Sequence, residues 1–135
     1  VLDMSKGIEA NVNIQLMRLE ENAKLTLKDI NFESNSAVLS EVSFVELQRV
    51  IQLLNENPQL KVELAAHTDD VGSDTYNLIL SDKRAKSVAD YLKQNNISPE
   101  RFITKGYGES LSKVPNTNEV NRAVNRRVEL KILSI

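Results

Sequence analysis

The sequence contains no cysteine and no tryptophan, and it has a single histidine, His67. The lack of cysteine excludes disulfide bonds, thiolate metal sites and a cysteine nucleophile, although it does not fix the redox compartment. A hydrolytic metal site needs several ligands, so one histidine argues against such a site. No apolar run approaches the roughly 18 residues that span a bilayer, so no transmembrane helix is expected.

An excess of charge of one sign is also missing. Seventeen basic residues face nineteen acidic ones, giving a net charge of −2, and aromatic residues make up only 4%. Arg122, Arg126 and Arg127 form a basic cluster, but few aromatic side chains are available to stack on bases. The balance argues against a nucleic-acid binder and against electrostatic docking to a membrane.

What is present fits one globular domain of 135 residues, with 41% hydrophobic and 27% charged residues. The chain starts at Val1 without a methionine or an apolar leader, so we interpret it as a piece of a longer protein. Residues 1–24 are expected to be an extension or the end of an upstream domain, and residues 25–135 the domain itself. Alternation over 12–16 predicts a strand, which could pair as a hairpin with a second extended stretch over 25–30.

The first helix is predicted from a capping pattern. Ser43 and Glu46 have the spacing of a capping box, so the helix should begin near Phe44. Apolar residues then recur at three- and four-residue steps until Asn57 and Pro58 end the pattern.

The rest of the chain alternates between the period of a strand and that of a helix. The expected elements are a strand over 62–66 that leads into His67, a helix from Tyr76 or Ser81 to Gln94, a strand over 102–107 and a strand over 128–132. This order predicts an α+β two-layer sandwich of βαβαβ type, in which helices pack on one face of a mixed sheet.

Residues 67–74 form the densest polar cluster, at the point where a strand ends and a helix approaches. Such edges are common ligand sites in open α/β sheets, and a solvated turn is the alternative interpretation. The spacing of the acidic residues does not match a calcium-binding loop. No serine lies in a nucleophile-elbow motif, and Gly106-Tyr107-Gly108 is typical of the exit from a strand.

Arg84 follows this cluster on the second helix. If Ser81 caps that helix or lies in its first turn, Arg84 lies at the amino-terminal end that faces the loop of Asp69. An arginine gains nothing from the helix dipole there, so a nearby anion would account for it better than an ordinary charged helix face.

Taken together, five separated motifs resemble the OmpA-like peptidoglycan-binding domain, which occurs in outer-membrane proteins, Pal-type lipoproteins and MotB-type stators. The resemblance covers residues 27 to 133. The motifs are His67-Thr68-Asp69 with Gly72, Tyr76-Asn77, Leu80-Ser81 with Arg84-Ala85, Gly106-Tyr107-Gly108-Glu109, and Asn125-Arg126-Arg127-Val128-Glu129.

The resemblance implies a site that holds the diaminopimelate residue of the peptidoglycan stem peptide. Asp69 and Arg84 would be the main ligand-holding pair, and Asn77 and Arg126 would support the same pocket. The remaining residues expected at the ligand, the first four of them on one segment, are Phe32, Glu33, Ser34, Asn35 and Thr68.

We therefore expect a non-catalytic module without cofactor or metal that tethers an outer-membrane or envelope protein to the cell wall, on the periplasmic face of the outer membrane of a Gram-negative bacterium. A peptidoglycan hydrolase using Asp69, Asp70 or His67 is one alternative. A structural or stator-type module, forming homo-oligomers or binding another protein chain, is the other.

Overall fold

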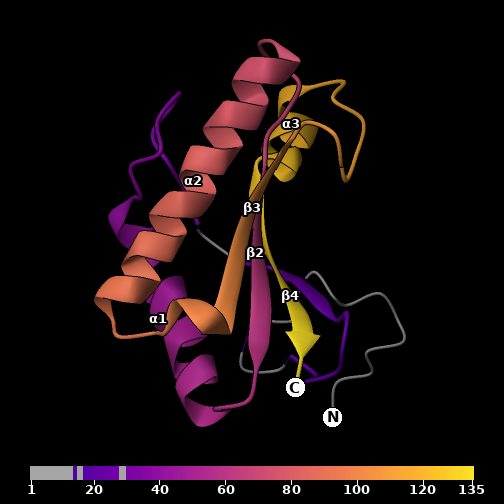
Figure 1. Ribbon diagram of the computed structural model, residues 1–135. Helices are drawn as coiled ribbons and strands as arrows, with labels where there is room; N and C mark the ends of the chain where they lie inside the picture. The colour runs from indigo at the N-terminus through magenta and orange to yellow at the C-terminus, as the bar shows by residue number, and fades with distance from the viewer. Residues whose placement is uncertain (1–13, 15–16, 28–29) are drawn as a thin grey trace.

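The structure, a computed structural model, describes residues 14, 17–27 and 30–135 (Figure 1). Strands and helices alternate along these residues. They are β1 (Lys24–Thr26), α1 (Glu41–Glu56), β2 (Lys61–His67), α2 (Asp74–Gln94), the 3-10 helix η4 (Pro99–Arg101), β3 (Phe102–Gly108), α3 (Glu119–Asn125) and β4 (Arg127–Ser134).

The four strands form one mixed sheet in the order β1-β4-β2-β3. β2 and β3 are parallel, with Leu64 opposite Thr104, while β4 is antiparallel to both β2 and β1. α1 and α2 lie on the same side of the sheet (Figure 1). The predicted α+β architecture, with helices packed on one face of a mixed sheet, is confirmed.

The core lies between the sheet and these two helices. Strand residues spaced two apart point into it, as the alternation in the sequence predicts. The buried side chains include Val62, Leu64 and Ala66 of β2, Val128, Leu130 and Ile132 of β4, Leu47, Val50, Ile51 and Leu54 of α1, and Ala85, Val88, Ala89 and Leu92 of α2.

The first helix begins earlier than the capping pattern predicts. α1 starts at Glu41 after Ser40, not near Phe44, and Ser43 is fully buried inside the helix. The Ser43 hydroxyl accepts a hydrogen bond from the backbone N–H of Asn31 at 2.8 Å and donates one to its carbonyl at 3.1 Å. Ser43, predicted as the cap, therefore binds the backbone of Asn31, in the segment before the helix, and does not cap α1. The predicted end at Asn57 is confirmed.

Two expectations near the amino end have different outcomes. The strand over 12–16 lies outside the described residues except for Ile14, which is buried and in a 3-10 conformation. Of the extended stretch predicted over 25–30, residues 25 and 26 lie in β1, which pairs with β4, and the hairpin predicted with 12–16 falls outside the described residues.

α2 lies so close to β3 that their backbones touch. A Cβ atom on Gly106 would lie 2.3 Å from the backbone nitrogen of Asp82, so no other residue fits there without moving the helix. The Ser81 hydroxyl accepts a hydrogen bond from the backbone N–H of Gly108 at 2.9 Å. These contacts fix the position of α2 against the sheet. Of the described helices, none is both long and apolar enough to cross a bilayer.

Candidate functional site

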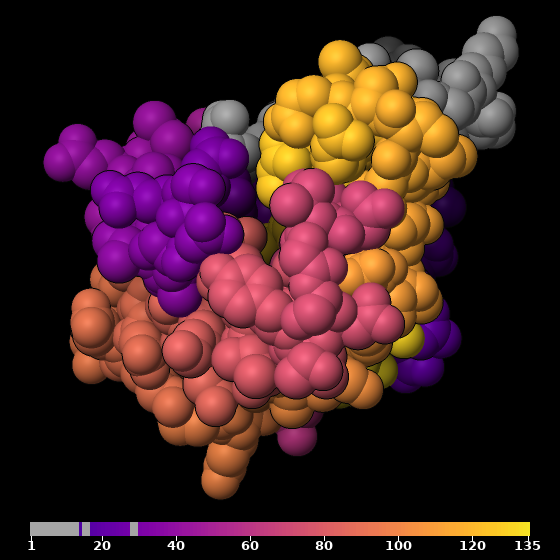
Figure 2. Space-filling view, turned by 90° about the horizontal axis from the view of Figure 1, so that it is seen from above, coloured from indigo at the N-terminus to yellow at the C-terminus, as the bar shows by residue number. Residues whose placement is uncertain are grey.

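A cavity of about 540 Å³ opens at the end of the sheet where β2 ends and β4 begins. Figure 2 shows the hollow between the segment around residue 33, the start of α2 and the region of α3. The lining comes from residues of the segment 30–35, from residues 66–71 at the end of β2, from α2 as far as Arg84, and from α3 with the start of β4.

Asp69 lies on the loop between β2 and α2, and its side chain is 11% exposed. One carboxylate oxygen, Oδ1, accepts a hydrogen bond from the backbone N–H of Val71 at 3.0 Å. The loop then turns at Gly72, which has φ +93°, and Ser73 caps α2 by accepting from the N–H of Tyr76. A single turn therefore fixes both the carboxylate and the start of the helix.

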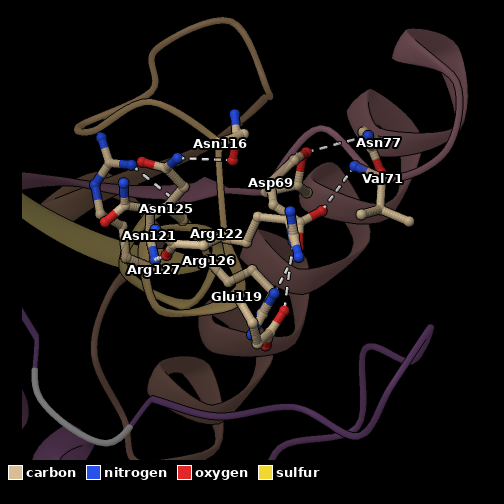
Figure 3. A network of polar contacts seen from close by, with 12 residues as sticks. Asp69, Val71, Asn77, Asn116, Glu119, Asn121, Arg122, Asn125, Arg126 and Arg127 are labelled. Atoms are coloured by element: carbon tan, nitrogen blue, oxygen red, sulfur yellow. Dashed lines mark hydrogen bonds and ion pairs between the residues drawn. The ribbon is translucent and has the colours of Figure 1, made fainter.

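Arg126, the first residue after α3, contacts Asp69 directly (Figure 3). Arg126 Nη1 donates to Asp69 Oδ2 at 2.6 Å, and Nη2 donates to Glu119 Oε2 at 2.6 Å. Hydrogen bonds to Glu119, followed by those to Asp69, raise the pKa of Arg126 despite partial burial. The same contact with Arg126 lowers the pKa of Glu119. Asp69 therefore already has one cationic partner in the free protein.

Arg84 is 8% exposed and contacts neutral groups. Its Nε donates to the carbonyl oxygen of Ser36 at 2.8 Å, its Nη2 donates to that of Glu33 at 3.4 Å, and its guanidinium carbon lies 4.9 Å from the centre of the Phe32 ring. Burial is the main cause that lowers the pKa of Arg84, and the nearby charge of Arg126 lowers it further. Two of its five N–H groups donate to carbonyl oxygens of described residues. The others donate to no described residue.

The position of Arg84 corrects the prediction made for it. Because α2 begins at Asp74, Arg84 lies about three turns into the helix and not at its amino-terminal end. Ser81 is likewise inside the helix and does not cap it. Arg84 still lines the same cavity as Asp69, because α2 runs back along the sheet beneath the loop.

Asn77 and Thr68 line the cavity, but their described hydrogen bonds are made within the protein. Asn77 Nδ2 donates to the carbonyl oxygen of Asp69 at 3.2 Å and to Glu109 Oε1 at 2.9 Å. The Thr68 hydroxyl donates to the same carbonyl oxygen of Asp69 at 2.8 Å. Both residues hold the backbone of Asp69 in place.

The segment 32–35 forms the wall opposite α3. Phe32, Ser34 and Asn35 line the cavity, whereas Glu33 takes part through its carbonyl oxygen on Arg84 and is not in the lining. The hydroxyl of Tyr76 donates to Asn35 Oδ1 at 3.2 Å, which links this segment to α2. The structure thus brings the expected residues of four segments to one site: 32–35, 68–69, α2 and the residue that follows α3.

His67 lies at the floor, where it stacks on Tyr107 with ring centroids 5.2 Å apart. Its Nε2 is 3.4 Å from Glu129 Oε1, but neither ring nitrogen makes a well-oriented hydrogen bond within the described structure. The contact with His67 and, after it, the contact with Arg127 lower the pKa of Glu129 to about 2. Of these two contacts, only the one in which Arg127 Nε donates to Glu129 Oε2 at 3.0 Å has the geometry of a hydrogen bond. No three acidic, histidine or cysteine side chains within residues 14, 17–27 and 30–135 are placed to hold a metal ion.

Two acidic residues at the site were not predicted. Glu119 lies on α3, a helix that is not among the predicted elements, and Glu109 belongs to one of the motifs but is not among the predicted ligand residues. The signal for α3 is Asn118, whose side chain caps the helix by accepting from the N–H of Asn121 at 2.8 Å.

Comparisons with known proteins identify the family of the chain. The model of the OmpA family matches residues 31–126. Outer membrane porin F of Pseudomonas fluorescens is 36% identical over 104 residues, covering 77% of this chain and 32% of the porin. Peptidoglycan-binding protein ArfA of Mycobacterium tuberculosis is 35% identical over 103 residues, covering 76% of this chain and 32% of ArfA.

A solved structure is similar over nearly the whole chain. The cell wall anchor of the T6SS from Pseudomonas aeruginosa superposes with a TM-score of 0.73 at 25% identity, and the match covers 98% of both chains. In contrast, the chain spans about a third of the length of the two curated relatives above. On the family match and these similarities, the chain belongs to the OmpA family.

Proposed function

We propose that this chain is a non-catalytic module that binds peptidoglycan reversibly through the diaminopimelate residue of the stem peptide. The observation that carries the proposal is the pair of Asp69 and Arg84, a carboxylate and a guanidinium that are both largely buried and line one cavity. The far end of diaminopimelate, the end outside the peptide chain, carries an ammonium and a carboxylate on one carbon. An anion and a cation held on two sides of a cavity complement this pattern.

Each charged residue has a distinct role in this proposal. Asp69 accepts hydrogen bonds from the ammonium group, and the unused N–H groups of Arg84 donate to the carboxylate as a planar fork. Asn77 and Thr68 keep the Asp69 loop in position, and Arg126 sets the orientation of the carboxylate. Phe32, Ser34 and Asn35 form the rim. Recognition needs no proton transfer and no bond cleavage, so no catalytic residue or cofactor is assigned.

The biological role we propose is to tether an outer-membrane or envelope protein to the cell wall from the periplasmic side. Support comes from relatives that are named an outer membrane porin and a peptidoglycan-binding protein, and from a structural neighbour described as a cell wall anchor. In this proposal residues 25–135 are the binding domain and residues 1–24 connect it to the rest of the protein.

The test is a titration of a stem tripeptide that ends in diaminopimelate, followed by backbone amide shifts. We expect saturable shifts that centre on residues 67–84 in the wild type. Asp69→Asn and Arg84→Gln should each bind about ten- to hundred-fold more weakly, because a sheltered charge-assisted hydrogen bond is lost. Asp90→Asn and Lys83→Gln, which remove exposed charges from α2, are the matched controls and should bind like the wild type.

Two altered peptides test the role of each group. A peptide with lysine in place of diaminopimelate lacks the far carboxylate, and a peptide amidated at that carboxylate lacks its charge, so both should bind less tightly. Equal titration curves for these and the parent peptide would contradict the role of Arg84. A wild-type domain that shows no shifts at all would overturn the proposal and favour a protein partner.

A further inference from the structure

Arg126 is shared between two carboxylates that differ in their surroundings. Its Nη1 contacts Asp69, whose side chain is 11% exposed, and its Nη2 contacts Glu119, whose side chain is 69% exposed. Both distances are 2.6 Å. Water and salt screen an exposed ion pair far more than a sheltered one, so the contact with Glu119 is the one that a competing anion can replace.

The two guanidinium groups of the cavity also differ. Arg84 has N–H groups that donate to no described residue, whereas Arg126 has one edge on Asp69 and the other on Glu119. A ligand with a single carboxylate can bind at Arg84 without disturbing α3. For a second carboxylate of the ligand, the other guanidinium group of the cavity is Arg126, which is already paired with Glu119.

We propose that Glu119 acts as an internal competitor, which occupies Arg126 in the free site and is displaced by a second carboxylate of the ligand. This inference rests on the proposed function and adds a ligand class to it, namely stem peptides in which both carboxylates of diaminopimelate are free. The far carboxylate binds at Arg84, and the carboxylate at the peptide-linked end replaces Glu119 on Arg126. Glu119 therefore lowers affinity for this class of peptide without touching the ligand.

The displaced carboxylate has a second partner to receive it. Glu119 Oε1 lies 3.5 Å from Nε of Arg122, one helical turn along α3. The side chain of Arg122 is 29% exposed and lies outside the cavity lining. Glu119 can therefore leave Arg126 and keep its ion pair with Arg122, which keeps the cost of displacement small.

The experiment compares Glu119→Gln with the wild type in titrations of the tripeptide that ends in diaminopimelate. Glutamine keeps the size of the side chain and removes the charge, so the variant should bind about three-fold more tightly. Loss of a merely structural contact would weaken binding, so the direction of the change is decisive. Glu100→Gln removes the same charge from η4, at the opposite end of β3, and should leave the affinity unchanged.

A second peptide links the effect to the second carboxylate. When the tripeptide is amidated at the peptide-linked carboxylate, Glu119→Gln and the wild type should bind it equally. On binding the unmodified tripeptide, the side-chain carboxyl 13C signal of Glu119 should move, and with the amidated peptide it should stay.

The outcomes separate this inference from the proposed function. Binding by the wild type that Glu119→Gln weakens or leaves unchanged would overturn the inference alone. An equal gain with both peptides would also overturn it, because the second carboxylate would then have no part in the effect. A wild type that binds neither peptide would overturn the proposed function and this inference with it.

Discussion

The two helical walls of the cavity are held in place by different kinds of contact. α2 is a helix of 21 residues that meets β3 at backbone distance, at Gly106, and buries a row of apolar side chains. α3 has 7 residues, and its two valines, Val120 and Val124, are exposed. One wall is therefore part of the hydrophobic core, and the other lies on the surface beside it.

A single buried side chain, Asn125, ties the short wall to the loop before it. Its Oδ1 accepts from the backbone N–H groups of Lys113 and Val114, and its Nδ2 donates to the carbonyl oxygen of Val114 and to Asn116 Oδ1. A polar anchor of this kind depends on every hydrogen bond being made, because the amide is fully buried.

The arginines on the two walls reflect this difference. Arg84, on α2, is set among carbonyl oxygens and has a pKa lowered mainly by burial. Arg126, beside α3, has a pKa raised mainly by Glu119 and also by Asp69. Among the described residues, the α2 wall thus presents an arginine that donates to neutral carbonyl oxygens, and the α3 wall presents one that is paired with two carboxylates.

The largest effect is expected when the α2 wall is displaced. Gly106→Ala places a Cβ atom 2.3 Å from backbone that cannot yield, so the free energy of unfolding should fall by about 3 kcal/mol or more. Urea unfolding measures it. Gly72→Ala is the matched control, because Gly72 has a positive φ of +93° but a Cβ atom there would meet its nearest neighbour at 3.4 Å, an ordinary van der Waals distance, and it should cost about 1 kcal/mol. Equal losses in both variants would mean that α2 and β3 adjust freely.

A smaller loss is expected from the anchor of the α3 wall. Asn125→Ala removes four hydrogen bonds and leaves buried backbone groups without partners, so the free energy of unfolding should fall by about 2 kcal/mol. Asn121→Ala removes a weaker contact with Thr117 from the same helix and should stay within about 0.5 kcal/mol of the wild type. If the two variants unfold alike in urea, Asn125 is not the anchor.

Lysine substitutions compare the two arginines directly. Arg84→Lys keeps the charge but loses the planar fork, so affinity for the diaminopimelate tripeptide should fall about ten-fold. Arg126→Lys keeps a cation near Asp69 and should cost only about two- to three-fold, because its contacts are partly exposed. Titration of both variants measures this difference. A larger loss in Arg126→Lys would move the principal anchor of the ligand to the α3 wall.

The same contrast explains how much the sequence could predict. β2, β3, β4 and the body of α2 were predicted because their side chains alternate or repeat against one core. α3 was missed because it has no apolar stripe, and its stability comes from Asn118 and Asn125, which are also common in loops. The early start of α1 was missed because Ser43 serves a tertiary contact with Asn31 that no local pattern records.

The site, like the fold, was predicted in part. The resemblance predicted that Asp69, Arg84 and Arg126 share one pocket, but Arg84 lies in the middle of α2 and not at its amino-terminal end. The ion pair between Asp69 and Arg126 joins residues 57 apart in sequence, and the contact with Glu119 depends on a helix that was not expected. Such pairings depend on how the α2 wall and the α3 wall face each other in the fold. Composition and motif spacing do not give this arrangement.

The smallest effect concerns the floor shared by both walls, where β2 ends and β4 begins. His67 and Arg127 lower the pKa of Glu129 from about 4.5 to about 2 in the folded protein, so the ionised carboxylate stabilises the fold. This stability is fully present above the unfolded pKa near 4.5 and is lost as the pH falls towards 2. Because Glu129 is only partly buried, we expect about 1 kcal/mol after allowing for solvent screening.

Urea unfolding of the wild type and Glu129→Gln at a series of pH values measures this contribution. The advantage of the wild type should shrink by about 1 kcal/mol as the pH falls from 4.5 to 2.5. Exposed Glu56, at the end of α1, provides the control variant Glu56→Gln, whose difference from the wild type should not change over this range. If the Glu129→Gln difference is equally flat, the stability of the floor of the site does not depend on the charge of Glu129.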